Sequence, residues 1–495
     1  MVKVVVGDEN QLKLAEDRLT QSGFTAQVGL VIGKLSSPLD RGFVFDLVPT
    51  PTNDAGEPAC SVVETKDDKK KGGSKSKSQV SDASTLFIDT DWVAEHARQV
   101  SRMLVGGMNV VGVYVWVSDT SFKNSTITLC QLLQTVKGVA EAAPILEGDW
   151  DERLLIHISY SPRRWTCRNC MLSSSITSSS IRPCDFKMGK VLSSMQRFRC
   201  IYNFELRLPI SHEHESTAST LSAILRYGIS THVKELRGAK AVIDGKLITN
   251  DEPCTTDTLH EVELLLPFLE CDPATEACSQ KNVDGLLVFG GSVCSFTYLN
   301  NKEPVSQAVA DIKFDIVRSL QSRLDILCDE ADQELAAEDE GTEEASQDRL
   351  SHKPVSKLAL HSLRKTCHLA FPRRVFIPWL GDIYICDYLQ PSETLEVIKD
   401  HCVELMSMQA PTDASTFFQP EVEAPSVISK SFWDVSVAGN SNNSSSSKSR
   451  EVDDASPESS NRQLRKTVNF SFSMVAAVLI LLMSILLGFV FVRKS

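Results

Sequence analysis

Hydrophobic and polar positions follow two different periods in the first part of the chain. In residues 10–22 and 89–104 apolar side chains recur every three or four positions, which predicts two helices with one buried face each. Residues 29–34 and 41–51 are apolar runs rich in β-branched residues, joined by a Ser-Ser-Pro turn, which predicts a β-hairpin. Residues 109–117 are apolar on both faces, as is typical of a central strand.

The rest of the chain continues this mixture of helical and strand patterns. The further predicted elements are helices at residues 125–143, 216–236, 305–328 and 393–406, strands at 154–161, 260–268 and 284–299, and a strand pair at 373–389 that turns about Gly381. In the helix at 305–328 the apolar residues form one stripe. The predicted fold class is therefore α+β.

Three polar, low-complexity stretches interrupt these elements. They are rich in Lys, Ser and Gly at residues 64–84, acidic at 336–353, and rich in Ser and Asn at 438–461. Such stretches have too few apolar side chains to offset the entropy that ordering would remove, so we predict that they are disordered. The predicted organisation is an α+β domain at residues 1–200 with a disordered insertion at 64–84, a second α+β domain at 201–409 interrupted by the acidic linker, and a disordered juxtamembrane linker at 410–468.

The apolar run at residues 472–492 is much longer than the others and contains no charge. A helix of that length spans about 31 Å, close to the hydrocarbon thickness of a bilayer, so we predict a transmembrane helix. The alternative is a buried core helix, but such helices are usually shorter. The residues chosen to represent the membrane anchor are Phe472, Val475, Leu479, Leu482, Leu486, Val490 and Val492.

The first residues of the chain lack the long apolar core of a signal peptide. We therefore expect a single-pass, tail-anchored membrane protein whose body stays in the cytosol. The glycosylation sequons at Asn442 and Asn443 provide a test of this topology, because they would be modified only in the lumen.

Composition narrows the possible partners and cofactors. The net charge of −13 argues against a nucleic-acid surface, and the basic cluster at residues 69–77 resembles a solvated linker. The fourteen cysteines show no disulfide framework, and a cytosolic body would keep them reduced. We expect no cofactor and no bound nucleic acid.

Two short motifs could in principle hold a metal ion or carry out redox chemistry. Cys167-x-x-Cys170 has no second pair at zinc-site spacing, so we interpret it as a chance spacing among many cysteines. His212 and His214 precede a predicted helix, where a solvated loop is the simpler interpretation. No nucleophile elbow, phosphate loop or dinucleotide motif is present, so we predict no enzyme activity. The alternative is a divergent Cys/His or metal-dependent isopeptidase.

Four aromatic residues follow the last predicted helix of the body. Phe417, Phe418, Phe432 and Trp433 could dock a partner or pack back on the body, and the sequence favours neither.

Several of these stretches together resemble one family. Residues 89–115 (DTDWVAEHARQVSRMLVGGMNVVGVYV), 29–37 (GLVIGKLSS) and 373–389 (RRVFIPWLGDIYICDYL), followed by a C-terminal anchor, are similar to the odorant-response-abnormal-protein-four family, in the same order. The resemblance implies a factor at the endoplasmic reticulum that assists the folding, trafficking or localisation of multi-spanning membrane proteins such as receptors. It also implies a partner, the ubiquitin-fold-modifier protease, which the family helps to hold at that membrane.

The first domain also resembles the JAMM/MPN fold, whose active members bind zinc through a His-x-His-Pro segment after the last strand of this series. Here residues 113–124 read VYVWVSDTSFKN and contain no His. The resemblance therefore implies an MPN-like fold without its zinc chemistry, and no catalytic or metal-binding residue is assigned.

Overall fold

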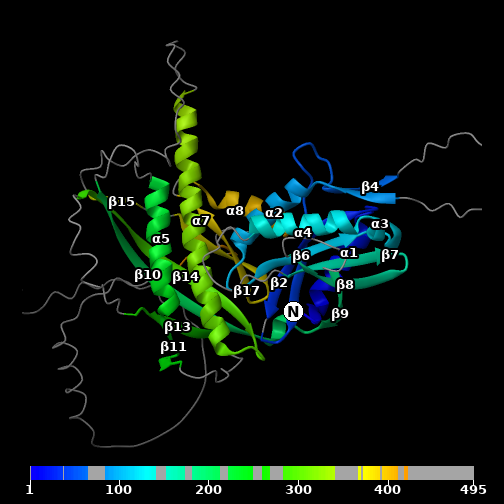
Figure 1. Ribbon diagram of the computed structural model, residues 1–495, viewed down its shortest axis with the longest axis horizontal. Coiled ribbons are helices and arrows are strands. Elements are labelled where there is room, and N and C mark those ends of the chain that lie inside the picture. Colours follow the sequence, from blue (N-terminus) through cyan, green and yellow to red (C-terminus); the bar gives the residue numbers. More distant parts are fainter. Residues whose placement is uncertain are drawn as a thin grey trace, which may run out of the picture. The chain divides into compact units, whose positions relative to one another are not determined.

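A closed β-barrel occupies the first part of the chain in the structure, which is a computed structural model (Figure 1). The described residues are 2–36, 38–64, 84–140, 152–172, 181–211, 221–248, 259–267, 283–339, 366–369, 372–390, 393–410 and 417–421. The barrel strands, in spatial order, are β1 (Val4–Asp8), β3 (Arg41–Pro49), β2 (Gln27–Ser36), β6 (Asn109–Trp116), β7 (Glu152–Tyr160), β8 (Arg163–Met171) and β9 (Ile181–Gly189). Parallel pairing of β9 with β1 closes the ring.

The predicted hairpin and central strand are confirmed. β2 and β3 pair antiparallel, and β6 lies between β2 and β7 with almost every side chain buried. The barrel strands β1, β8 and β9 were not predicted. The reason is visible in β8, where polar side chains at the start of the strand are exposed and interrupt the apolar alternation.

Helices cover both faces of these strands. They are α1 (Glu9–Gln21), α2 (Thr90–Met103), α3 (Asp119–Asn124) and α4 (Thr126–Ala140), with the short pair β4 (Cys60–Glu64) and β5 (Ser84–Ile88) beside α3. Asp89 caps α2, because its carboxylate accepts a hydrogen bond from the Trp92 amide at 3.0 Å. The helix predicted at residues 125–143 is observed as α4, and the short helix α3, which was not predicted, precedes it. The two helices meet at Ser125, whose hydroxyl accepts the Leu86 amide of β5 at 2.7 Å.

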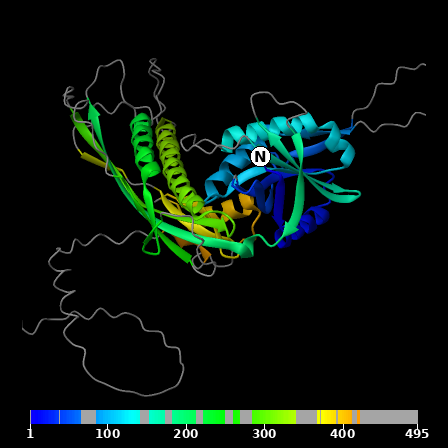
Figure 2. The same ribbon diagram turned by 60° about the horizontal axis from the view of Figure 1, so that its bottom comes forward.

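A second, six-stranded sheet follows a short 3-10 turn (Leu192–Ser194). Its strands, in spatial order, are β12 (Lys246–Leu247), β11 (Lys240–Ile243), β13 (Leu259–Leu265), β10 (Met195–Ser211), β14 (Val283–Asn300) and β15 (Thr366–Leu369). α5 (Leu221–Gly238) and α7 (Val305–Asp339) lie side by side on it (Figures 1 and 2). The predicted stripe of α7 is buried, and the helix continues past residue 328 into the acidic stretch that was predicted to be disordered.

A hairpin near the end of the described chain packs with the barrel as well as with the second sheet. β16 (Arg373–Leu380) and β17 (Ile383–Leu389) turn at Gly381, whose φ of +61° favours glycine, and α8 (Leu395–Met406) follows. β18 (Gln419–Pro420) adds to β16. Side chains of this hairpin and of α8 share one apolar cluster with β2, α2 and α4. This cluster contains residues from both sides of residue 200, where the sequence predicted a domain boundary. The boundary itself stays a prediction.

A buried ion pair joins the barrel to α7. Lys34 of β2 places its Nζ 2.6 Å from Asp311 Oδ2 and 3.4 Å from Glu303 Oε2, and its side chain is only 4% exposed. Burial alone would lower the pKa of Lys34, but the two carboxylates outweigh it and hold that pKa above its ordinary value. The contact fixes the second sheet against the barrel.

Candidate functional site

The end of β6 is where the JAMM/MPN resemblance would place metal ligands. Ser118 caps α3 there, and β7 brings in His157, whose Nε2 lies 3.0 Å from the Val117 carbonyl oxygen. Its Nδ1 lies 3.9 Å from Asp119 Oδ1, and its ring stacks on Phe122 with centroids 4.0 Å apart. Burial lowers the pKa of His157. One imidazole and one carboxylate lie close together here. In the described ranges, no group of three or more His, Cys, Asp or Glu side chains is placed to hold a metal ion.

The Cys167-x-x-Cys170 motif lies on β8, where residues three apart point to opposite faces of the sheet. Cys167 belongs to the apolar cluster that includes α1, and Cys170 to the cluster that includes α4. The two thiols therefore cannot share a metal ion or form a redox pair with each other. Each has another thiol as its partner: Cys184 of β9 for Cys167, and Cys130 of α4 for Cys170.

A cleft of about 290 Å³ lies where α2 approaches α8. We call it the α2–α8 cleft and define it by its lining residues Pro51, Asp54, Trp92, Glu95, His96, Gln99, His401, Glu404 and Leu405. Its size is at the lower end of the range for small-ligand or side-chain pockets. The helical pattern predicted that α2 buries one face, but nothing in the sequence indicated that α8 would supply the other wall.

Two side chains of α2 build the floor of this cleft. His96 is 3% exposed and lies between Thr50 Oγ1, 3.3 Å from Nδ1, and the Leu405 carbonyl oxygen, 2.8 Å from Nε2. Because a carbonyl oxygen only accepts, Nε2 carries the proton in this bond. Burial lowers the pKa of His96, so an uncharged imidazole makes the hydrogen bond that links α2 to α8. Trp92 is half-buried, and its indole N–H donates to the Pro51 carbonyl oxygen at 3.0 Å.

Negative charge surrounds the cleft. Asp54 and Glu404 are exposed at its rim, whereas Glu95 accepts hydrogen bonds from Arg98 on its own helix. His401 Nδ1 lies 2.8 Å from Asp387 Oδ2, and this hydrogen bond raises the pKa of His401. An indole face beside carboxylates suits a cationic side chain.

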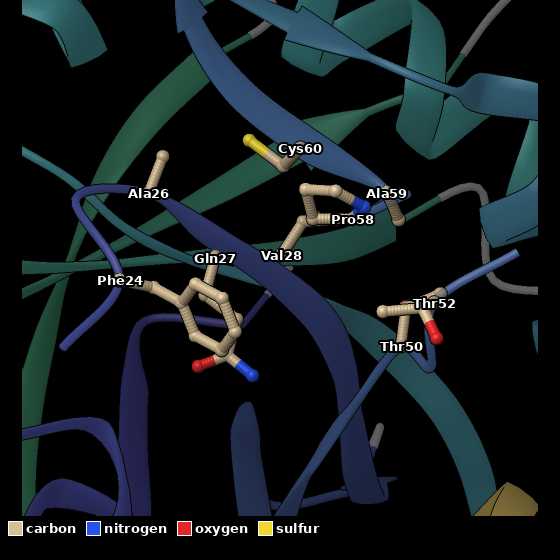
Figure 3. A pocket seen from close by; sticks show the side chains of 9 residues that line it. All are labelled: Phe24, Ala26, Gln27, Val28, Thr50, Thr52, Pro58, Ala59 and Cys60. Atoms are coloured by element: carbon tan, nitrogen blue, oxygen red, sulfur yellow. The ribbon is translucent and has the colours of Figure 1, made fainter. Parts of the chain in front are cut away.

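A smaller pocket of about 50 Å³ lies beside the start of β2 (Figure 3). Its lining residues are Phe24, Ala26, Gln27, Val28, Thr50, Thr52, Pro58, Ala59 and Cys60. Burial raises the pKa of Cys60 to about 12, so its thiol stays protonated and is a poor nucleophile at neutral pH. The pocket has room for little more than a water molecule.

The last described residues are held against the body by buried charge. Glu421 accepts two hydrogen bonds from Arg323 of α7 at 2.8 and 2.7 Å and one from the Cys294 amide at 2.6 Å. Phe418 is 3% exposed and Phe417 packs against the same core, so these two aromatics pack back on the body. The linker predicted at residues 410–468 thus begins with residues that belong to the fold.

Other predictions fall on residues that the structure does not describe. They include the predicted anchor at 472–492 with all seven residues named for it, His212 and His214, Phe432 and Trp433, both sequons, and most of the three polar stretches. Among the helices that are described, none combines the length and the apolar character needed to cross a membrane.

The comparisons with known proteins agree on one family. A sequence model of the family described as "Odorant response abnormal 4-like" matches residues 29–417. "Protein odr-4 homolog" of Mus musculus is 25% identical over 64% of this chain and 68% of its own length, and that of Homo sapiens is 26% identical over 64% and 69%. The Dictyostelium discoideum homolog is 22% identical over 82% of this chain and 79% of its own length.

Among solved structures, "Crystal structure of UfSP from C.elegans" matches with a TM-score of 0.35 and 8% identity, covering 82% of this chain and 57% of that one. At this TM-score the match does not establish a shared fold.

Proposed function

Because the chain belongs to the odorant-response-abnormal-4-like family, we propose that it is a non-catalytic adaptor, anchored in a membrane by the C-terminal helix at residues 472–492. The observation that carries the proposal is the family match over residues 29–417, followed by an uncharged apolar run of membrane-spanning length. The mixed α+β body would then stand on the cytosolic side of a single-pass, tail-anchored protein.

The adaptor would act at the endoplasmic reticulum. There it assists the folding, trafficking or localisation of multi-spanning membrane proteins such as receptors, and it holds a ubiquitin-fold-modifier protease at the membrane. Family membership supports this assignment.

The α2–α8 cleft is the docking surface that we assign to the protein partner. Trp92 is half-buried beside the exposed carboxylates of Asp54 and Glu404, and Trp is among the residues that most often dominate binding energy at interfaces. The complementary segment of the partner is therefore basic, with an Arg or Lys side chain over the indole.

Deletion of residues 472–495 tests the anchor. The tagged full chain should sediment with endoplasmic-reticulum membranes and resist extraction at alkaline pH, and the deleted chain should stay in the supernatant. Replacing the deleted residues by an unrelated C-terminal anchor should restore the membrane fraction. A deleted chain that still pellets, or a chain glycosylated at Asn442 or Asn443, would contradict the anchor or the cytosolic topology respectively.

Charge reversal at the cleft tests the docking surface. Glu404→Lys is a change at an exposed position, so it should leave the body folded while weakening co-purification of the protease from membranes. The matched control is Glu396→Lys, an exposed carboxylate on the same helix that does not line the cleft. Equal recovery of the protease with both variants and with the native chain would rule out the cleft as its docking surface.

A further inference from the structure

Two cysteines face each other across a pair of barrel strands. Cys167 of β8 and Cys184 of β9 are direct register partners in an antiparallel pair. Cα atoms at such positions lie about 4.5–5.5 Å apart, within the range of about 4.4–6.8 Å that a disulfide bridges. Both cysteines are free thiols in the structure. The strand register therefore places the two cysteines at a backbone separation that a disulfide can bridge.

The two thiols have unequal surroundings. Cys167 is 3% exposed and donates its S–H hydrogen bond to Cys184, which is half-buried and therefore reachable from solvent. The hydrogen bonds from Cys167 and from the Asn169 backbone N–H lower the pKa of Cys184, and in its protonated form the Cys184 S–H donates to the Val2 carbonyl oxygen, 3.6 Å from Sγ. The hydrogen bond to Cys184 and burial raise the pKa of Cys167.

We propose that Cys184 and Cys167 are a reversible dithiol site for hydroperoxides, with Cys184 as the attacking thiol and Cys167 as the resolving thiol. An accessible thiolate beside a second cysteine is the arrangement found in redox-sensing cysteine pairs.

Both chemical steps balance with a hydroperoxide as the only oxidant. The Cys184 thiolate attacks the terminal peroxide oxygen, so that an S–O bond forms and the O–O bond breaks. The departing alkoxide, or hydroxide in the case of hydrogen peroxide, takes a proton and leaves as an alcohol or as water. The sulfur is oxidised to a sulfenic acid and the peroxide is reduced. The Cys167 sulfur then attacks the Cys184 sulfur, the S–S bond forms, and the hydroxyl leaves as water with the Cys167 proton. A dithiol reductant returns both thiols.

The cross-link would act on the closure of the barrel. β9 pairs with β8 on one side and with β1 on the other, and β1 is the first strand of the chain. A Cys167–Cys184 bond would fix β9 to β8 covalently and so limit opening of the barrel along this side.

A second thiol pair in the same region provides an internal control. Cys130 of α4 and Cys170 of β8 also share a hydrogen bond, but both are 1% exposed. A hydroperoxide in water reaches Cys184 and not this pair as long as the chain is folded.

The test uses the full-length chain, reduced and then treated with hydrogen peroxide, followed by alkylation and peptide mapping without reductant. A cross-linked peptide with Cys167 joined to Cys184, lighter by about 2 Da than the two thiol peptides together, should form and should disappear with dithiothreitol. Cys184→Ser should abolish it. Cys167→Ser should leave a sulfenic acid on Cys184 that dimedone labels, and Cys130→Ser should leave the cross-link unchanged.

Two outcomes would overturn the proposal. One is the absence of the Cys167–Cys184 cross-link from a chain whose circular dichroism shows that it stays folded in peroxide. The other is a Cys130–Cys170 cross-link that forms as fast, because this would show that accessibility and the surroundings of Cys184 do not control the reaction. Failure of the membrane or pull-down experiments would leave this result unaffected, since the site does not depend on the adaptor role.

Discussion

Removal of the Asp315 carboxylate should strongly destabilise the fold, because it leaves a buried charge without a partner. Among the described residues, Arg374 has the largest side chain that is fully buried, at 0% exposure. Its two terminal nitrogens lie 2.8 and 3.0 Å from the Asp315 oxygens. The remaining bonds go to the Cys294 carbonyl oxygen and to the Cys386 sulfur, both at 3.1 Å, and neither partner carries the compensating charge.

The magnitude follows from this geometry. Burial works against the charge of Arg374, and the Asp315 carboxylate is the main group that holds its pKa well above the ordinary value. Breaking a buried ion pair from one side typically costs about 3–5 kcal/mol, so Asp315→Ala should lower the free energy of unfolding by about that amount. Replacing both partners at once by apolar residues, Asp315→Leu with Arg374→Met, should recover most of the loss.

Urea unfolding followed by tryptophan fluorescence measures these differences. The matched control is Asp325→Ala on the same helix, whose pair with Arg226 is 3.2 Å long but whose side chains are 34% and 62% exposed. That control should change the free energy of unfolding by about 1 kcal/mol or less. A loss below about 1 kcal/mol for Asp315→Ala, or a double variant no better than the single one, would refute the reasoning.

Three further predictions concern the barrel. Burial raises the pKa of Asp46 to about 6. The free energy of unfolding should therefore fall by about 3 kcal/mol as the pH rises from about 4 to 6, because Asp46 ionises in the unfolded chain before it does so in the folded one. Asp46→Asn should remove this pH dependence and raise the free energy of unfolding at neutral pH. Gly112→Ala should prevent stable folding, because the added Cβ would lie 1.9 Å from a carbonyl oxygen of β7. The control is Gly138→Ala on α4, which has open space around it and should be neutral or slightly stabilising. Thermal melts followed by circular dichroism compare the two variants. If the Cys167–Cys184 bond forms, the oxidised chain should resist unfolding by about 3 kcal/mol more than the reduced chain, and an unchanged urea midpoint would contradict this.

The local patterns of the sequence were sufficient for most of the described helices and for several of the strands, but not for the long strand β10. The hairpin of β2 and β3, the buried face of α2 and the stripe of α7 are each encoded within a few residues, so periodicity predicted them. β8 and β9 were missed because their partly exposed, polar faces give no such pattern.

The candidate site was predicted only in part, because its contacts join residues that are far apart in the sequence. The spacing of apolar residues predicted that α2 has one buried face. The hydrogen bond from His96 on that helix to the Leu405 carbonyl oxygen, however, joins residues 309 positions apart, and no local pattern predicts this contact. The buried pair of Arg374 and Asp315 is also beyond the reach of local patterns, because its members are 59 positions apart.

By itself, the sequence determined the family, the α+β class and an apolar run long enough to cross a bilayer, because each depends on the order and spacing of neighbouring residues. Only the tertiary structure decided which thiols are partners. A strand alternates its side chains between two faces, so Cys167 and Cys170, adjacent in the motif, are separated, and strand register brings Cys184 to Cys167 instead.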